Sequence, residues 1–240
     1  MKRFKRFKTE KYNGMAEVSH NFKVEETDDG SKITIYGEIG DFWWDATSAS
    51  DIEKVLRNVT SENIEVHINS PGGDAFDGIA IYNQLKDHPA KITVYIDGLA
   101  ASAASIIAMA ADELIMNTGS MLMIHEAWTF AFGSKGDIKK TLNALEGIDK
   151  SLADIYMTRF QGERSEVETM LVNETWFTSS EAVEVGLADR VNEVEEEVDP
   201  EEFKNNVLQR FRQIIKEPIV PEEPIVASKS NVLDRFKRLS

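Results

Sequence analysis

The sequence contains no cysteine among its 240 residues. That absence removes disulfide bonds, thiol nucleophiles and thiolate metal sites, and it fits a reducing cytoplasm. The chain also lacks an H-E-x-x-H pair, a cluster of histidine and aspartate, and a G-x-x-x-x-G-K-[ST] phosphate loop, which are common signatures of metal and nucleotide sites. We therefore expect no cofactor, no metal and no hydrolysis of ATP by this chain.

Positive charge and long apolar runs are scarce as well. Lysine and arginine number 27 against 42 acidic residues, a net charge of −15, which argues against a nucleic-acid partner because phosphate binding needs a basic surface. The most apolar stretch, residues 98–111, is too short to cross a bilayer. No apolar run follows the basic stretch 2–8, as a signal peptide requires. We expect no membrane association and a cytoplasmic location.

Strands alternate with helices along the middle of the chain. Alternating or short apolar runs predict strands at residues 32–36, 64–69, 92–96, 114–116 and 121–124. Helical periodicity predicts helices at residues 74–88, 100–111, 137–161, 165–171 and 179–185. Ser50, with Glu53 three residues later, predicts the start of a further helix. This order of elements implies parallel strand pairing and an α/β fold.

Changes in composition divide the chain into three parts. We expect a basic N-terminal arm at residues 1–19, a folded domain at 20–193, and an acidic, proline-containing tail at 194–240. The tail contains a near-repeat, residues 206–212 and 231–237. Short helices that bind a partner and a solvated, disordered segment are both compatible with this repeat.

The first motif with candidate chemistry is Gly98-Leu99-Ala100-Ala101-Ser102, where a strand ends and a helix begins. A serine at this point lies beside the free N–H groups of the first helical turn, which favour negative charge. Ser102 can be a nucleophile, or it can simply cap a buried helix. Ser105, one turn later and inside the helix, is a rival nucleophile that is better explained by packing.

Two further motifs follow other strands. Ser70-Pro71-Gly72-Gly73 contains paired glycines, which allow N–H groups to point into a cleft as an oxyanion hole requires, but a plain strand-to-helix turn would look the same. Met123-Ile124-His125 ends an apolar strand, a rigid support for a general base, or for a core histidine. None of the other histidines, His20, His67 and His88, follows a glycine-rich loop.

Together these motifs resemble the proteolytic subunit of the Clp protease family. The matching stretches are residues 68–73, 98–102, 123–125 and 181–189, and the resemblance runs from about Ile33 to Val191. Segments 41–44 and 174–177 are most similar to phage- and prophage-encoded members, for which head maturation is the expected role. The resemblance implies the family's α/β fold, a spiral of βαβ units shared with crotonase-type enzymes, with residues 137–161 as a protruding handle helix.

The resemblance also implies the site residues. Ser102 would be the nucleophile, His125 the base, and Glu174 the third member of the triad, at a position where aspartate is commoner in the family. Glutamate can orient a histidine equally well, but a solvated carboxylate at a helix end is the alternative for Glu174. Asp149 and Asp154, on the handle helix, are weaker rivals for this role.

By the same resemblance, the backbone N–H groups of Gly73 and Ala103 would be the oxyanion donors. The expected activity is that of a serine endopeptidase acting on polypeptides inside homo-oligomeric rings of six or seven subunits, often stacked. Its partner would be a separate ATPase unfoldase in protein degradation, or a capsid or scaffold protein in phage head maturation in the bacterial host cytoplasm. A catalytically silent structural ring and a crotonase-type acyl-CoA enzyme, which lacks the serine–histidine pair, are the alternatives.

Overall fold

The computed structural model describes residues 18–40 and 46–192. In this part of the chain, nine strands form one sheet with the order β1-β2-β4-β5-β6-β9, to which β3 is added beside β2, β7 beside β5, and β8 beside β7. Antiparallel pairing joins β1 to β2 and β7 to β8, and the remaining pairs are parallel. The strands are β1 (Asn21–Thr27), β2 (Gly30–Ile39), β3 (Ala46–Thr47), β4 (Asn63–Gly73), β5 (Lys91–Ala101), β6 (Glu113–Asn117), β7 (Met121–Ile124), β8 (Thr175–Thr178) and β9 (Arg190–Asn192).

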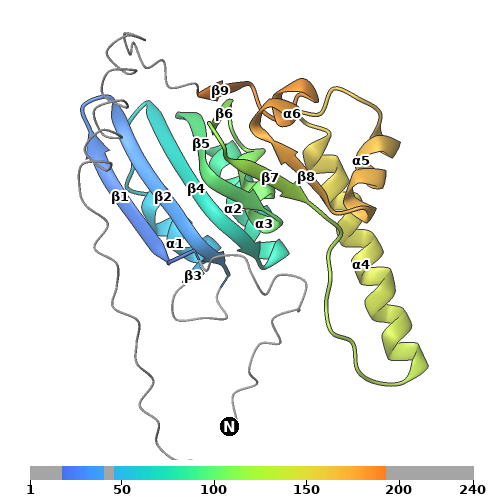
Figure 1. The fold of residues 1–240 in the computed structure, drawn as a ribbon. Helices are drawn as coiled ribbons and strands as arrows, with labels where there is room; N and C mark the ends of the chain where they lie inside the picture. Colours follow the sequence, from blue (N-terminus) through green and yellow to red (C-terminus); the bar gives the residue numbers. More distant parts are fainter. Residues whose placement is uncertain (1–17, 41–45, 193–240) are drawn as a thin grey trace, which may run out of the picture. The chain divides into compact units, whose positions relative to one another are not determined.

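Helices cover one face of the sheet, and this confirms the predicted α/β fold. Figure 1 shows α1, α2 and α3 packed against that face, while α4 extends away from the sheet with α5 and α6 near its base. None of the helices in the described ranges combines the length and the apolar character needed to cross a membrane. The helices are α1 (Ala49–Leu56), α2 (Ala75–Asp87), α3 (Ala103–Ala108), α4 (Lys135–Tyr156), α5 (Arg164–Val172) and α6 (Ser179–Glu184).

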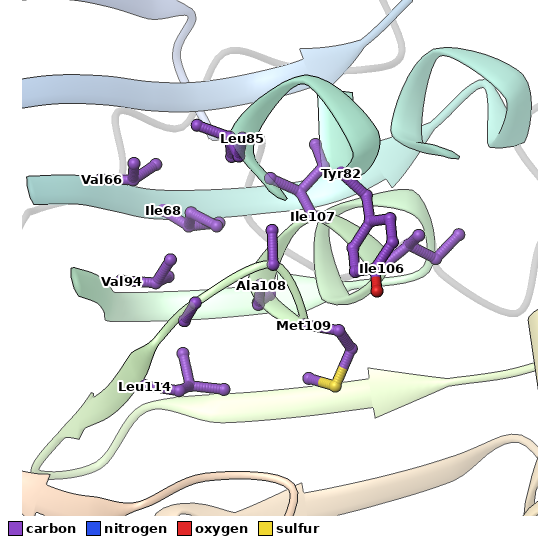
Figure 2. Close-up of a cluster of buried hydrophobic side chains, with 14 of the residues drawn as sticks. Val66, Ile68, Tyr82, Leu85, Val94, Ile106, Ile107, Ala108, Met109 and Leu114 are labelled. Carbon is purple, nitrogen blue, oxygen red and sulfur yellow. The ribbon is translucent and has the colours of Figure 1, made fainter. Parts of the chain in front are cut away.

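The core lies between the central strands and helices α2 and α3. Side chains alternate between the two faces of a strand, and every second residue is buried in β4 and in residues 91–96 of β5. Figure 2 shows these side chains pointing toward Leu85 of α2 and Ile107 and Ala108 of α3. Full burial of such an aliphatic side chain contributes about 1.5–3 kcal/mol. The buried residues of these two strands include Ile64, Val66, Ile68, Ile92, Val94 and Ile96.

Parallel pairing brings three chain segments to the same edge of the sheet. β4 and β5 are joined by the crossover helix α2, and their register pairs Ser70 with Ala100. β7 pairs beside the end of β5, with Ala101 opposite Met123. The residues that follow these pairs, among them Ser102 and His125, are therefore neighbours in space.

Two predicted boundaries near this edge were wrong. β4 continues through residues 70–73, because Gly73 still pairs with Ile39 of β2. The glycine pair thus belongs to a strand and not to a strand-to-helix turn. β5 likewise continues to Ala101, so α3 begins at Ala103 and is shorter than the helix predicted at residues 100–111.

The predicted helix start at Ser50 was also wrong. The N-cap of α1 is Ser48, which forms a capping box with Asp51. Strands β1, β3, β8 and β9 were not predicted, and the last three have only two to four residues, too few for periodicity to be seen. Most of the predicted arm, all of the predicted tail and segment 41–44 lie outside the described residues.

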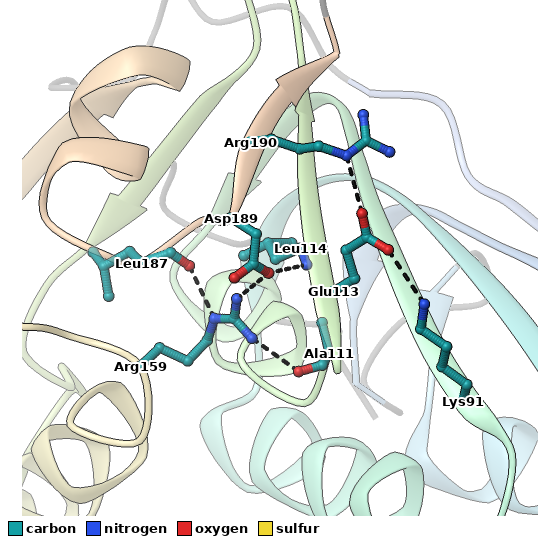
Figure 3. Close-up of polar contacts among 8 residues, drawn as sticks. All are labelled: Lys91, Ala111, Glu113, Leu114, Arg159, Leu187, Asp189 and Arg190. Atoms are coloured by element: carbon teal, nitrogen blue, oxygen red, sulfur yellow. Dashed lines mark hydrogen bonds and ion pairs between the residues drawn. The ribbon is translucent and has the colours of Figure 1, made fainter.

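Arg159, just beyond α4, connects three parts of the domain (Figure 3). Its guanidinium donates to the carbonyl oxygens of Leu187 at 3.2 Å and Ala111 at 2.9 Å, and it pairs with the Asp189 carboxylate. Asp189 also accepts from the N–H of Leu114 at 2.6 Å. The Arg159 side chain is only 11% exposed, although that of Asp189 is 45% exposed, and the two bonds that Arg159 donates to carbonyl oxygens are charge-assisted. Arg159 fixes the base of α4 against the sheet.

Candidate active site

Ser102 and His125 meet at the edge where the strands end. His125 Nε2 lies 2.7 Å from Ser102 Oγ, a hydrogen-bond distance. Ser102 stands between β5 and α3, and His125 directly follows β7. Both side chains are partly exposed. At this distance an imidazole can accept the hydroxyl proton while a substrate approaches from the open side.

The backbone of Ser102 adopts a rare conformation, with φ 55° and ψ −125°. A non-glycine residue in such a region stores about 1–3 kcal/mol and persists only when the surrounding structure enforces it. Here the N–H of Ser102 donates to the Met123 carbonyl at 3.0 Å, and its own carbonyl accepts from the N–H of Ser105 at 2.9 Å. A serine on a sharp, strained turn from strand to helix is a known way to expose a nucleophile.

Gly72 and Gly73 lie directly against this turn. Gly72 has φ 89°, and a Cβ there would lie 2.5 Å from the Ala101 carbonyl oxygen and 2.7 Å from Ser102 Cβ. Only glycine permits such a close approach in this conformation. The predicted oxyanion donors, Gly73 and Ala103, line the same pocket as Ser102. The sequence motifs on β4 and β5 are thus brought into contact.

A pocket of about 300 Å³ opens beside the serine–histidine pair. Its polar side includes Ser102, His125 and the carboxylate residues Asp74 and Glu126, and its apolar side is formed mainly by α3 and α4. Phe76 and Trp128, both exposed, lie at the pocket as well. An apolar pocket next to a few polar groups is typical of a site that receives one apolar group of a ligand. Its apolar lining from α3 and α4 includes Ile106, Leu145, Ile148 and Leu152.

Glu174 approaches the pair from β8. The antiparallel register of β7 and β8 ends at Ile124 opposite Thr175, and His125 and Glu174 are the next residues beyond this last pair. Glu174 follows the C-cap of α5 and is half-buried. Its φ is 50°, and in residues 18–40 and 46–192 Ser102 and Glu174 are the two non-glycine residues with positive φ. Ser102 after β5, His125 after β7 and Glu174 before β8 thus lie at the same edge of the sheet, and their action as a triad stays a prediction.

The rival residues are engaged elsewhere. Asp149 Oδ1 accepts from the N–H of Ala127 at 2.8 Å, and Asp154 forms an ion pair with Arg164. Ser105 is fully buried and does not line the pocket. Since its hydroxyl is used in hydrogen bonds inside the core, the geometry favours Ser102 over Ser105 as the exposed hydroxyl.

One residue of the site was missed in the sequence. Tyr156, the last residue of α4, was assigned only to the apolar side of the handle helix, but it lines the pocket and its hydroxyl lies 2.8 Å from Ser105 Oγ. The sequence offered one indication of this contact: a tyrosine on the apolar side of a helix is expected to be buried, and a buried tyrosine needs a hydrogen-bond partner for its O–H group. In the described ranges no group of three or more metal-ligating side chains is close enough to hold an ion.

These features define an α/β protein that carries a serine–histidine constellation at the carboxyl ends of parallel strands. The profile of the Clp protease family matches residues 24–195, well over half of the chain, and the chain belongs to this family. It is similar to ATP-dependent Clp protease proteolytic subunit 1 of Protochlamydia amoebophila, with 31% identity over 136 residues that cover 55% of this chain and 66% of that protein.

Two further relatives give similar values. The ATP-dependent Clp protease proteolytic subunit of Bacteroides thetaiotaomicron is 29% identical over 132 residues, which cover 54% of this chain and 60% of that protein. Proteolytic subunit 1 of Chlamydia abortus is 29% identical over 128 residues, which cover 52% and 67% respectively. The matched part thus spans 60% to 67% of the length of these relatives.

Proposed function

We propose that this chain is a serine endopeptidase in which Ser102 attacks a peptide carbonyl and His125 takes its proton. The observation that supports this most directly is the 2.7 Å contact between Ser102 Oγ and His125 Nε2. Ser102 also lies on a strained turn from strand to helix, the kind of turn on which a nucleophilic serine is exposed. Family membership and relatives that are proteolytic subunits support the same reaction. Glu174, which directly precedes the residue paired with Ile124, would orient the imidazole and stabilise its protonated form.

The reaction follows from these roles. As Ser102 Oγ bonds to the carbonyl carbon, His125 removes its proton and then delivers that proton to the leaving amine. The amine departs and leaves an acyl-enzyme. Water then attacks the acyl group, again with His125 as base, and the acid product and free Ser102 are released. The N–H groups of Gly73 and Ala103 would stabilise the negative oxygen of each tetrahedral intermediate.

The pocket suggests which side chain the site accepts. Its lining from α3 and α4 is mostly apolar and carries no charge, so an apolar side chain next to the cleaved bond would bury its surface there. A charged side chain placed against α3 and α4 would lose its hydration without gaining a partner there, because the charged lining residues Asp74 and Glu126 lie outside these two helices. We therefore expect cleavage after apolar residues in polypeptide substrates.

A ring of subunits is the proposed assembly. Phe130, Phe132, Ile138 and Leu142 are exposed on α4 and on the segment before it, and an exposed apolar surface of this kind is typical of a protein interface. Phage head maturation is the proposed role, with Clp-type degradation alongside a separate ATPase as the second candidate. Neighbouring genes for portal and capsid proteins, or for a chaperone ATPase, would distinguish these two roles.

Covalent labelling tests the reaction. The full chain is treated with a fluorophosphonate and digested, and the labelled peptide is identified by mass spectrometry, with Ser102→Ala as the control. We expect a single adduct on Ser102, together with peptide hydrolysis that the label abolishes. An assembled ring that shows neither labelling nor hydrolysis would support the silent ring, and turnover of an acyl-CoA thioester without a Ser102 adduct would support the crotonase-type enzyme.

A further inference from the structure

A buried chain of hydroxyl groups connects helix α4 to the turn that carries Ser102. Ser105 Oγ donates to the Ser102 carbonyl oxygen at 2.6 Å and lies 2.8 Å from the hydroxyl of Tyr156. The Ser105 hydroxyl has one proton, and it is used on that carbonyl, so the Tyr156 hydroxyl donates to Ser105 Oγ. Ser105 is 0% and Tyr156 1% exposed. Bulk water therefore does not compete for these bonds.

This chain ends at the carbonyl of the strained residue. The Ser102 carbonyl also accepts from the backbone N–H groups of Ser105 at 2.9 Å and Ile106 at 3.3 Å. Any helix start offers such backbone bonds, whereas the third bond requires a hydroxyl side chain at residue 105. This bond from Ser105 Oγ is the shortest of the three. Burial raises the pKa of Tyr156, so the phenol remains protonated at neutral pH and is able to donate.

Helix α4 is tied to the other half of the site as well. Asp149, two turns before Tyr156, accepts from the N–H of Ala127 at 2.8 Å, and Ala127 is two residues beyond His125. Through Tyr156 the same helix reaches the turn of Ser102. One helix thus contacts the segments that carry both members of the pair.

We propose that Tyr156 and Ser105 are positioning residues that hold the Ser102 backbone in its strained conformation, so that Ser102 Oγ faces His125. The inference rests on the proposed peptidase function. Neither hydroxyl contacts His125, and the Tyr156 ring lines the pocket while its hydroxyl is directed to Ser105. Removal of either hydroxyl should therefore impair the chemical step and leave substrate binding intact.

Kinetics of three variants test this role in the full chain. Ser105→Ala removes the bond to the Ser102 carbonyl, and we expect kcat for an apolar peptide substrate to fall about tenfold with KM unchanged within about twofold. Tyr156→Phe keeps that bond but removes the hydrogen bond that the Tyr156 hydroxyl donates to Ser105 Oγ, and we expect kcat to fall about threefold. Tyr82→Phe is the matched control, because Tyr82 is also largely buried, at 9% exposure, and lies outside the pocket; its kcat should not change.

The double variant separates positioning from general stability. Ser105→Ala alone leaves the buried Tyr156 hydroxyl without an acceptor, which should lower the melting temperature. Adding Tyr156→Phe removes that unsatisfied group, so the melting temperature should recover while kcat remains as low as in Ser105→Ala. Recovery of kcat together with stability would mean that the hydroxyl chain only supports the fold, and the inference would be overturned.

A second readout does not depend on activity. In a crystal structure of the double variant, we expect Ser102 to leave its positive φ or to lose the 2.7 Å contact with His125. A variant that keeps both features overturns the inference even if the wild-type chain proves to be inactive. A wild-type chain without fluorophosphonate labelling would instead contradict the proposed function, so the two failures are distinguishable.

Discussion

Two histidines of the sheet each have a close polar partner, yet their surroundings differ. His125 Nε2 lies 2.7 Å from Ser102 Oγ, and His67 Nδ1 lies 2.9 Å from Asp97 Oδ2. The first pair stands where strands end, beside a pocket and a strained turn. The second stands within regular strands β4 and β5, on the face opposite the buried residues of those strands, and lines no part of that pocket.

The Asp97 carboxylate is saturated with donors. The Tyr36 hydroxyl donates to it at 2.6 Å and the Asn117 side-chain amide at 2.7 Å, in addition to His67. The His67 ring is stacked on Tyr95 with centroids 4.8 Å apart. These contacts join β2, β4, β5 and β6 on the face that α1–α3 do not cover. This second cluster, Tyr36–His67–Asp97–Asn117, is suited to stabilising the sheet.

The pKa values agree with that role. Burial alone would raise the pKa of Asp97, but the hydrogen bonds from His67 and Tyr36 outweigh it and lower the pKa overall. Burial, and then the bond to Asp97, raise the pKa of Tyr36 to about 12. A short distance between a histidine and a polar side chain, as in both pairs, is therefore no sign of catalysis by itself. The strained turn and the pocket distinguish the first pair.

The largest expected effect is at the first pair. Ser102→Ala should lower kcat/KM by about 10⁵-fold or more, and adding His125→Ala should cost little further, because the two residues act as a unit. Peptide hydrolysis measures this effect, with thermal denaturation as the check on folding. His67→Ala is the control and should change kcat/KM by less than about twofold. A large loss of activity in a folded His67→Ala variant would break the distinction between the two clusters.

The next effect concerns the two carboxylates. Glu174→Gln should lower kcat by about 10³- to 10⁴-fold, as expected when the acid of a triad can no longer orient its histidine. Asp97→Asn is the matched change at the second cluster and should leave kcat close to that of the wild type. Steady-state kinetics of both variants give the comparison. A Glu174→Gln variant with full activity would remove Glu174 from the triad.

A smaller effect is expected in stability. Asp97→Asn replaces an acceptor by a group that cannot accept all three hydrogen bonds, and it should lower the free energy of unfolding by about 2 kcal/mol. Urea denaturation followed by circular dichroism measures the change. Glu65→Gln, next to His67 on the same face but 3.8 Å from its ring, is the control and should have little effect. Equal losses for both variants would argue against a specific role for Asp97.

The smallest effect is on the pH dependence of stability. The pKa of Asp97 is lower in the folded state than its ordinary value of 3.8. The ionised Asp97 carboxylate therefore contributes its full share to the free energy of unfolding above pH 3.8, and this share is lost as the pH falls through the folded-state pKa. The stability difference between wild type and Asp97→Asn should therefore be constant above about pH 5 and shrink toward acid. A difference that grows on acidification would contradict the direction of this shift.

Much of the fold followed from local pattern. The apolar alternation of β4 and β5 and the helical periodicity of α4 predicted where these elements lie, although α4 ends at Tyr156 and not at residue 161, and the α/β class was confirmed. The resemblance to the Clp protease family was confirmed for residues 24–195. The strand continuation through Gly72 and Gly73 was missed, because glycine normally ends a strand and only pairing with β2 extends this one. The catalytic roles of Ser102, His125 and Glu174 stay predictions.

By itself, the sequence determined the order of the central strands and the helices, and the glycine and serine motifs at the ends of β4 and β5, since these depend on neighbours a few residues apart. Only the tertiary structure decided that Ser102 and His125, separated by 23 residues, are in contact, and that Tyr156 reaches Ser105 across 51 residues. The positive φ of Ser102 was equally invisible in the sequence. Strain and hydrogen-bond partners of this kind arise from pairing between distant strands and helices, which no local pattern encodes.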